Sequence, residues 1–375
     1  MLHNIVLFFI QIIVIIILNK ITQNKTIYDN NKNFLKLTGL DYKFSHEDNN
    51  SIIGIKIKFK NFDESSMKIL RQRINNIIMN TNNFTAEKVN NKKYIKLLSK
   101  EETIKCMLNE EVNSLDELKQ KLIDSKIHTL ISINNKNGEL YVYWNHAIMD
   151  GIRMINICQN FLNYDCKISK IPKLELNGNY MLYSIFNTIK LNNLCNYNNN
   201  IKPEVYKFKI NQNIINEIQN KYNSTFNGAF MKYMLDYLNI DTCLTAMITP
   251  GIRTNQFNSY GILPFNYYKL NNAKDIDNKL LKNYGYTFLS NLYLMNYHLL
   301  NNNQESNLNI DVLFSGLSFC KEEPKVGNMI LDDFEVNIPF QTTPVYIFSL
   351  KCKDTIHITV SVVNKEINDK IKEIN

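Results

Sequence analysis

The chain has 375 residues, 45% of them hydrophobic, and a formal net charge of +8 at pH 7. A chain of this length can bury a full core without disulfides, and its lysines are dispersed without an aromatic-basic stripe, so no nucleic-acid partner is expected. The seven cysteines form no CxxC pair, which argues against a zinc site and favours buried thiols in a reducing compartment.

The first predicted element is an apolar run at residues 5–18, in which only Gln11 is polar. A helix over this run would extend roughly 21 Å, less than the ~30 Å hydrocarbon core of a membrane. No small-x-small cleavage site follows it, so we expect residues 1–24 to be an uncleaved anchor and spacer rather than a signal peptide. Lys20 and Lys25 lie on its C-terminal side, which places the remainder in the cytosol; the alternative is the endoplasmic reticulum lumen or secretion.

Residues 25–170 are predicted to alternate strands with helices. In GIKIKFKNF (54–62), apolar residues alternate with lysines, which predicts a half-buried strand. Asp63 can then cap a helix. The apolar stripe of that helix is Met67, Leu70, Ile74, Ile77 and Ile78.

A second strand is predicted at KYIKLL (93–98), and Ser114 with Glu117 forms a capping box that begins another helix. IHTLISI and ELYVYWN flank NNKNG, which predicts a hairpin over residues 127–145. A helix over about residues 150–164 follows. One face of it carries Ile152, Ile155, Cys158 and Leu162.

Residues 165–203 lose this periodicity and contain Pro172 and Pro203, so we predict a crossover to a second half at residues 171–375. That half is predicted to contain a strand at 205–210, helices at 213–222 and 226–238, and further strands at 243–250, 311–319, 344–351 and 355–363. Strands and helices mix without regular alternation, which favours an α+β fold in which each half is a mixed sheet covered by helices.

His146 is the strongest candidate for chemistry. GxGxxG, GK[ST], HExxH and GxSxG are all missing from the sequence. His146 ends a predicted strand, and Asp150 and Gly151 open the next helix; an imidazole there can take a proton from a hydroxyl or amine near neutral pH. Asp150 would accept bonds from helix-start amides or pair with an arginine, while Gly151 would let the backbone pass close behind the histidine. A capped helix start beside a partly exposed histidine is the alternative.

The other histidines show no metal-ligand spacing, so no metal site is predicted and each is expected to be a surface or incidental residue. They are His3, His46, His128, His298 and His357.

The stretch HAIMDG at 146–151 resembles the HxxxDG signature of the CoA-dependent acyltransferase superfamily, which includes chloramphenicol acetyltransferase, plant BAHD acyltransferases, wax-ester synthases and condensation domains. The resemblance extends over about residues 35–365, because the order of predicted elements around the motif is similar in both halves. Many members have a histidine where this chain has Asn145, and the DFGWG stretch of the plant branch is missing.

This resemblance implies two chloramphenicol-acetyltransferase-like halves with an active-site tunnel between them. His146 would act as general base on an alcohol or amine that attacks an acyl-CoA thioester; acyl-CoA is a co-substrate, and no bound cofactor is implied. Ser315 and Ser318, which flank Gly316, would donate to the oxyanion unless they are ordinary strand serines. Arg253 would pair with Asp150, with Arg153 as a nearer rival.

The sequence therefore predicts a membrane-anchored acyltransferase, expected to be a monomer. The alternatives are an inactive homologue that binds a ligand or partner, and a condensation-type amide former that uses a carrier-bound donor. The sequence leaves open the acceptor, the acyl length and whether the product is an ester or an amide.

Overall fold

The computed structural model of the chain describes residues 25–29, 32–37, 51–81, 84–90, 94–108, 110–162, 203–238, 244–250, 260–266, 272–282, 312–320, 325–338 and 344–363. The apolar run at 5–18, most of the crossover at 165–203 and Arg253 lie outside these residues, as do His3, His46 and His298. No helix in the described residues is both long enough and apolar enough to cross a membrane.

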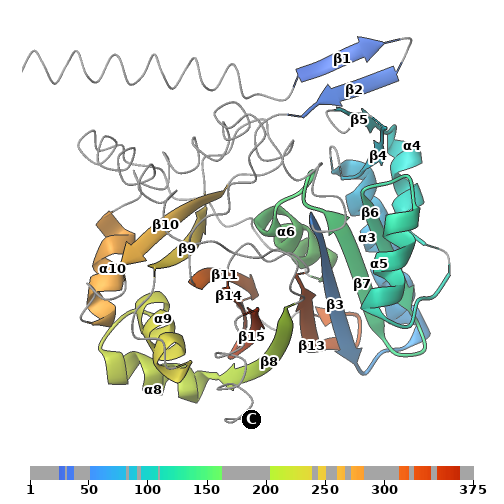
Figure 1. Cartoon of the computed structure of the whole chain (residues 1–375). Helices are drawn as coiled ribbons and strands as arrows, with labels where there is room; N and C mark the ends of the chain where they lie inside the picture. The colour runs from blue at the N-terminus through green and yellow to red at the C-terminus, as the bar shows by residue number, and fades with distance from the viewer. Residues whose placement is uncertain are drawn as a thin grey trace, which may run out of the picture.

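A five-stranded sheet contains the predicted hairpin (Figure 1). Its order is β12-β13-β3-β7-β6, and all its neighbouring strands run antiparallel. The hairpin turn holds Gly138 at φ 63°, in the left-handed region that favours glycine. The strands are β3 (Ile52–Lys60), β6 (Thr129–Asn134), β7 (Glu139–Asn145), β12 (Lys325–Val326) and β13 (Met329–Asn337).

Helices cover both faces of this sheet. On one face, α3 (Glu64–Asn80) and α6 (Gly151–Leu162) pack in the same apolar cluster as the alternating apolar residues of β3. On the other face, α5 (Leu115–Asp124) packs against the tyrosines of β7. The predicted cap of α3 is confirmed, since Asp63 Oδ1 accepts a bond from Ser66 N.

A mixed six-stranded sheet forms from the C-terminal part of the chain, in the order β10-β9-β11-β14-β15-β8. Strand β11 runs parallel to both β9 and β14, and the remaining pairs are antiparallel. The strands are β8 (Glu204–Asn211), β9 (Leu244–Pro250), β10 (Tyr260–Asn266), β11 (Val312–Cys320), β14 (Val345–Cys352) and β15 (Thr355–Val362). The helices that accompany it are α8 (Gln212–Tyr222), α9 (Phe226–Tyr237) and α10 (Ala273–Lys282).

A small sheet of order β1-β2-β5-β4 completes the strands of the described residues. Strand β5 (Tyr94–Leu97) was predicted, and it is followed by α4 (Lys100–Thr103) and the 3-10 turn η2 (Ile104–Cys106), which were not. The other strands are β1 (Lys25–Asp29), β2 (Lys32–Lys36) and β4 (Ala86–Lys88).

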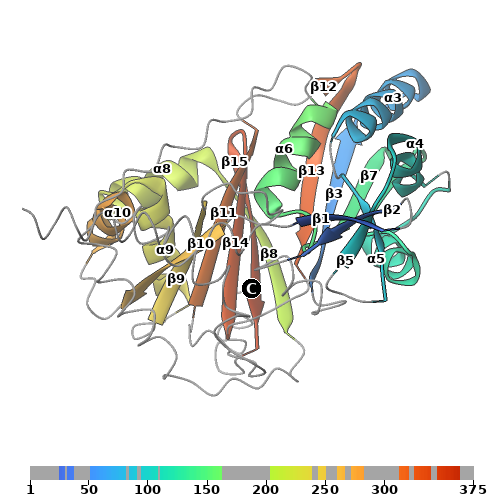
Figure 2. The ribbon, with the colours of Figure 1, turned by 90° about the horizontal axis from the view of Figure 1, so that it is seen from above.

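The two larger sheets share one apolar core through α6. Figure 2 shows α6 between them. Alternate residues of β14 divide between two clusters: Tyr346 and Phe348 join the one that contains α6, whereas Val345 and Ile347 join the one formed with α8 and α9. This alternation follows from the two-residue period of a strand, and it means that β14 is buried on both faces.

The predicted fold class is confirmed, and two details of the predicted helices differ. Glu117 accepts a bond from Asn113 N rather than closing a capping box with Ser114, although Ser114 does cap α5. Ile152 of α6 is only half-buried, because the face that packs inward also includes Met154 and Phe161.

The boundary between the halves stays a prediction. Strand β13, from the C-terminal part of the chain, pairs with β3 of the N-terminal part, with Val336 opposite Ile55. The division at residue 170 therefore does not separate the strands into two independent sheets.

Candidate active site

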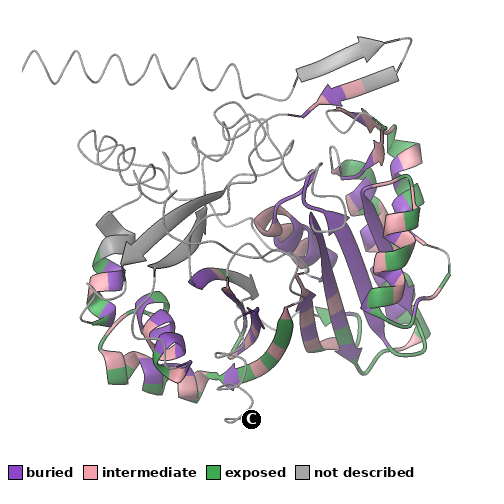
Figure 3. Ribbon diagram, in the orientation of Figure 1, coloured by how far each residue is buried: buried purple, intermediate pink, exposed green. Residues whose placement is uncertain are grey.

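His146 follows directly on a strand that is buried along its whole length. Every residue of β7 is buried, as the purple colour of this strand shows in Figure 3. Aromatic and β-branched residues of this kind favour a strand covered on both faces. Trp144 also donates from its indole Nε1 to Met149 O at 3.0 Å, which ties the end of the strand to the far end of the motif loop.

The backbone of the motif loop is held by specific hydrogen bonds. His146 N donates to Ser51 O at 2.7 Å, and Ile148 N donates to Asn145 O at 3.2 Å. The Asn145 side chain accepts a bond from Ala147 N at 2.8 Å, which is the local turn that asparagine favours. With only 6% of its surface exposed, the His146 side chain is nearly buried, not partly exposed as in the alternative interpretation.

Asp150 caps the start of α6, as predicted. Its Oδ1 accepts a bond from Arg153 N at 2.7 Å, and its main-chain oxygen accepts one from Met154 N at 3.0 Å. Asp150 is 3% exposed. Its predicted ion pair with Arg253 falls outside the described residues. Gly151 is the first residue of α6 and is not among the glycines with positive φ, so its conformation does not itself require glycine.

The two candidate serines separate on β11. Ser315 pairs with Phe348 and Ser318 with Lys351 in a regular stretch of the ladder. Positions three apart on a regular strand fall on opposite faces, so Ser315 and Ser318 do not share one face. Burial raises the pKa of Tyr346 to about 12, opposed by a hydrogen bond with Ser315. Since Tyr346 belongs to the cluster that contains α6, Ser315 is the serine on the side of the motif helix.

Of the remaining histidines that the structure describes, His128 is buried, whereas His357 is only partly buried. His128 lies next to β6 and is 6% exposed; burial, with a smaller contribution from Lys88, lowers its pKa to about 3. Burial also lowers the pKa of His357 on β15, and the nearby carboxylate of Asp333 partly offsets this. Packing beside the strands buries His128 and partly covers His357, which scattered positions in the sequence do not reveal.

Other chemical groups in the described residues give no second centre. No cluster of three or more histidine, cysteine, aspartate or glutamate side chains there could hold a metal ion. Burial raises the pKa of Cys106 and Cys158 far above its usual range, so neither is a ready nucleophile.

A cleft of about 180 Å³ lies away from the motif, between β8 and β13, and none of its lining residues belongs to residues 146–151. Its charged lining forms ion pairs between the two sheets, joining Lys207 to Glu335 and Lys209 to Asp333. We call these four residues the charged seam. Because the charges are paired with one another, the cleft is better described as a junction than as a substrate site.

The comparisons with known proteins find likeness in structure alone. The trichothecene 15-O-acetyltransferase from Fusarium sporotrichioides matches with a TM-score of 0.62 at 11% identity, over 94% of this chain and 96% of that one. The condensation domain of the Monacolin K polyketide synthase MokA matches with a TM-score of 0.59 at 10% identity, over 93% and 96%. The chain has the condensation-domain fold. No protein-family model matches it, and no curated protein matches it in sequence.

A third structure with the condensation-domain fold shows a ligand. The starter condensation domain of rhizomide synthetase, in a variant complexed with C8-CoA, matches with a TM-score of 0.55 at 7% identity, over 89% of this chain and 90% of that one. At such identities the likeness establishes the fold and leaves the substrate to be tested.

Two residues around His146 escaped the sequence analysis. Ser51 supplies both the main-chain acceptor for His146 and a hydroxyl that donates to Asn145 Oδ1 at 3.2 Å. Asn145 had been noted only as a departure from the family pattern. An asparagine at a strand end is itself a turn signal, so the turn at Asn145 could have been predicted. Ser51 is too far from His146 in the sequence to have been found.

Proposed function

We propose that the chain is an acyltransferase that moves an acyl group from acyl-CoA to an alcohol or amine, with His146 as general base. The observation that carries this proposal is the placement of His146: it follows a fully buried strand, its backbone is hydrogen-bonded, and the motif loop that it begins leads into α6, which packs between the two sheets. A base held this way is pre-positioned for proton transfer.

In the proposed reaction the His146 imidazole takes the proton from the acceptor hydroxyl or amine. The acceptor atom attacks the thioester carbonyl carbon and forms a tetrahedral oxyanion. The carbon–sulfur bond then breaks, and the imidazolium returns the proton to the CoA thiolate, so no acyl-enzyme forms. A hydrogen-bond donor to the oxyanion is commonly worth about 3–4 kcal/mol, and Ser315 is the candidate on the face of β11 that meets the motif helix.

The fold supports this proposal because an acetyltransferase and a domain complexed with C8-CoA both share it. The test uses purified full-length chain, C8-CoA and a panel of alcohols and amines, with chromatographic detection of free CoA. We expect His146→Ala to lose at least ~100-fold in turnover, because general base catalysis contributes 10²–10⁴-fold. His357→Ala, a histidine at the cleft between β8 and β13, is the matched control and should keep wild-type turnover. Near-full turnover by His146→Ala would overturn the mechanism.

We further propose that the apolar run at residues 5–18 anchors the protein to a membrane with the catalytic part in the cytosol, since the nearest lysines follow the run. Mass spectrometry of protein from cells tests this at the sequon that begins at Asn83. An unmodified Asn83 and an intact N-terminus are expected. A glycan at Asn83 would place the catalytic part in the lumen instead.

A further inference from the structure

The end of the β6–β7 hairpin next to His146 is held by a side-chain clamp that reaches across three chain segments. Asn145 N donates to the main-chain oxygen of His128, which lies in the segment before β6, and the two atoms are 2.8 Å apart. On the other side, the hydroxyl of Ser51, the residue before β3, donates to Asn145 Oδ1 at a distance of 3.2 Å. The same Asn145 oxygen accepts the bond from Ala147 N, so one amide oxygen joins β3 to the loop that follows His146.

This clamp controls both sides of the histidine backbone. Ser51 O accepts the bond from His146 N itself. Asn145, the residue before His146, is held by its own bond to His128 O, and its side chain holds Ala147, the residue after. Ser51 is 0% exposed and Asn145 is 5% exposed. Water therefore has little access to replace a lost partner, and a broken bond in such a site moves the backbone instead of being re-solvated.

We propose that Ser51 and Asn145 are positioning residues that hold His146 at the angle and depth required of the general base. This inference rests on the proposed function and adds the residues through which the fold sets the position of the base. A displacement of about 1 Å at a reacting group can cost about 10²-fold in rate, so the clamp should affect turnover far more than substrate binding.

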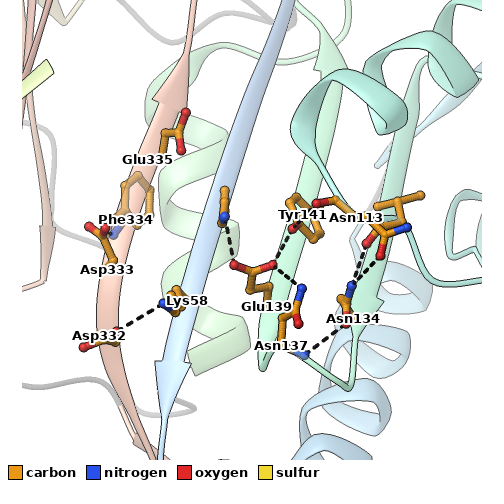
Figure 4. A network of polar contacts seen from close by, with 12 residues as sticks. Lys58, Asn113, Asn134, Asn137, Glu139, Tyr141, Asp332, Asp333, Phe334 and Glu335 are labelled. Atoms are coloured by element: carbon orange, nitrogen blue, oxygen red, sulfur yellow. Dashed lines mark hydrogen bonds and ion pairs between the residues drawn. The ribbon is translucent and has the colours of Figure 1, made fainter. Parts of the chain in front are cut away.

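The opposite end of the same hairpin offers a matched control. Asn134 Oδ1 accepts bonds from Lys136 N at 3.0 Å and Asn137 N at 3.1 Å, the same kind of turn that Asn145 makes beside the motif. It is fully buried, and its amide also donates to Val112 O. Figure 4 shows Asn134 within a separate network with Asn113, Glu139 and Tyr141. Asn134→Ala thus removes an equivalent buried turn bond from the same hairpin without touching the motif.

The experiment compares Asn145→Ala, Ser51→Ala, their double variant and Asn134→Ala in the full-length protein. Turnover of C8-CoA with the best acceptor of the panel gives kcat and KM. In parallel, the ring signals of isotopically labelled histidine are recorded by NMR across pH, with His146→Ala identifying the His146 signal among the six histidines. The ring signal reports the position of His146 whether or not the chain turns over the substrate.

We expect Asn145→Ala to lower kcat by about 10- to 100-fold with KM changed less than about threefold, and to shift the His146 ring signal. Ser51→Ala should lose less, because its main-chain bond to His146 remains. In the double variant, Ser51→Ala should add almost nothing, since its hydroxyl acts through Asn145. Asn134→Ala should leave kcat and the His146 signal unchanged.

Three results would overturn the proposal. They are a wild-type kcat and ring signal in Asn145→Ala, an equal loss in Asn134→Ala and Asn145→Ala, and strict additivity of the Ser51 and Asn145 changes. The proposed function fails separately: if His146→Ala keeps its turnover, His146 is not the base, while an altered ring signal in Asn145→Ala would still establish the clamp.

Discussion

Asp150 allows the capping role of the motif aspartate to be separated from the role of its charge. Asp150→Asn keeps an oxygen that can accept the bond from Arg153 N, whereas Asp150→Ala removes it. Both variants lose the negative charge at the start of α6. The difference between them in unfolding free energy therefore measures the cap, and the loss that they share measures the charge.

The magnitudes follow from the geometry. The cap is short, at 2.7 Å, and Asp150 is nearly buried, so removing the oxygen should cost about 1–2 kcal/mol. Loss of a negative charge at a helix N-terminus adds about 0.3–1 kcal/mol. We thus expect Asp150→Asn to be destabilised by less than about 1 kcal/mol and Asp150→Ala by about 1–3 kcal/mol.

Chemical denaturation of both variants, followed by circular dichroism, measures these differences, and turnover of C8-CoA is measured on the same samples. Asp63→Ala is the matched control, because Asp63 caps α3 through the same 2.7 Å bond to the residue three positions on. Its variant should lose stability and keep kcat, whereas both Asp150 variants should lower kcat by displacing the loop.

Equal stability of Asp150→Asn and Asp150→Ala would refute the capping argument. A loss well above about 1 kcal/mol in Asp150→Asn would show instead that the charge has a close partner. The resemblance implies Arg253 for this partner, and a double-mutant cycle of Asp150→Asn with Arg253→Met would then show coupling between the two positions.

Three further predictions concern the stability of the described fold. Asp277 of α10 is nearly buried and accepts bonds from Ser224, Thr225 and Gly228 at the start of α9. Asp277→Ala should cost roughly 2–4 kcal/mol in denaturant unfolding, because the buried Gly228 N and the partly buried donors of Ser224 and Thr225 lose their acceptor. A loss below about 1 kcal/mol would contradict this. His128 is neutral in the folded state, because its pKa is lowered from 6.5 to about 3. The unfolded chain therefore binds an extra proton, and stability falls as pH drops from about 6.5 toward 3, by up to about 1.4 kcal/mol per pH unit. His128→Phe should flatten this slope in acid titrations, and an unchanged slope would assign it to other groups. Lys209→Met removes the half-exposed ion pair with Asp333 from the charged seam and should lower the free energy of unfolding by less than about 1 kcal/mol. A larger loss in thermal or denaturant unfolding would mean that the seam, and not the apolar core shared through α6, joins the two sheets.

The sequence by itself determined the local elements around the site. The two-residue alternation in β3, the apolar stripe of α3, the hairpin ending at Asn145 and the cap at Asp150 were all predicted within a few residues. Each of these features depends on residues close in sequence, because side-chain periodicity, turn chemistry and capping are set within a few residues of one another. The separation of Ser315 from Ser318 on a strand was also implicit in their spacing.

Only the tertiary structure decided what meets across long stretches of chain. Three contacts join segments that carry no reciprocal sequence signal. They are the pairing of β13 with β3, the hydrogen bond from His146 N to Ser51 O, and the capping of α9 by Asp277. The burial of His128 is of the same kind, because it results from strand packing and not from the residues beside it. Strand register and helix contacts are set by the packing of the whole core, so the candidate base could be found from the sequence, while the residues that hold it in place required the fold.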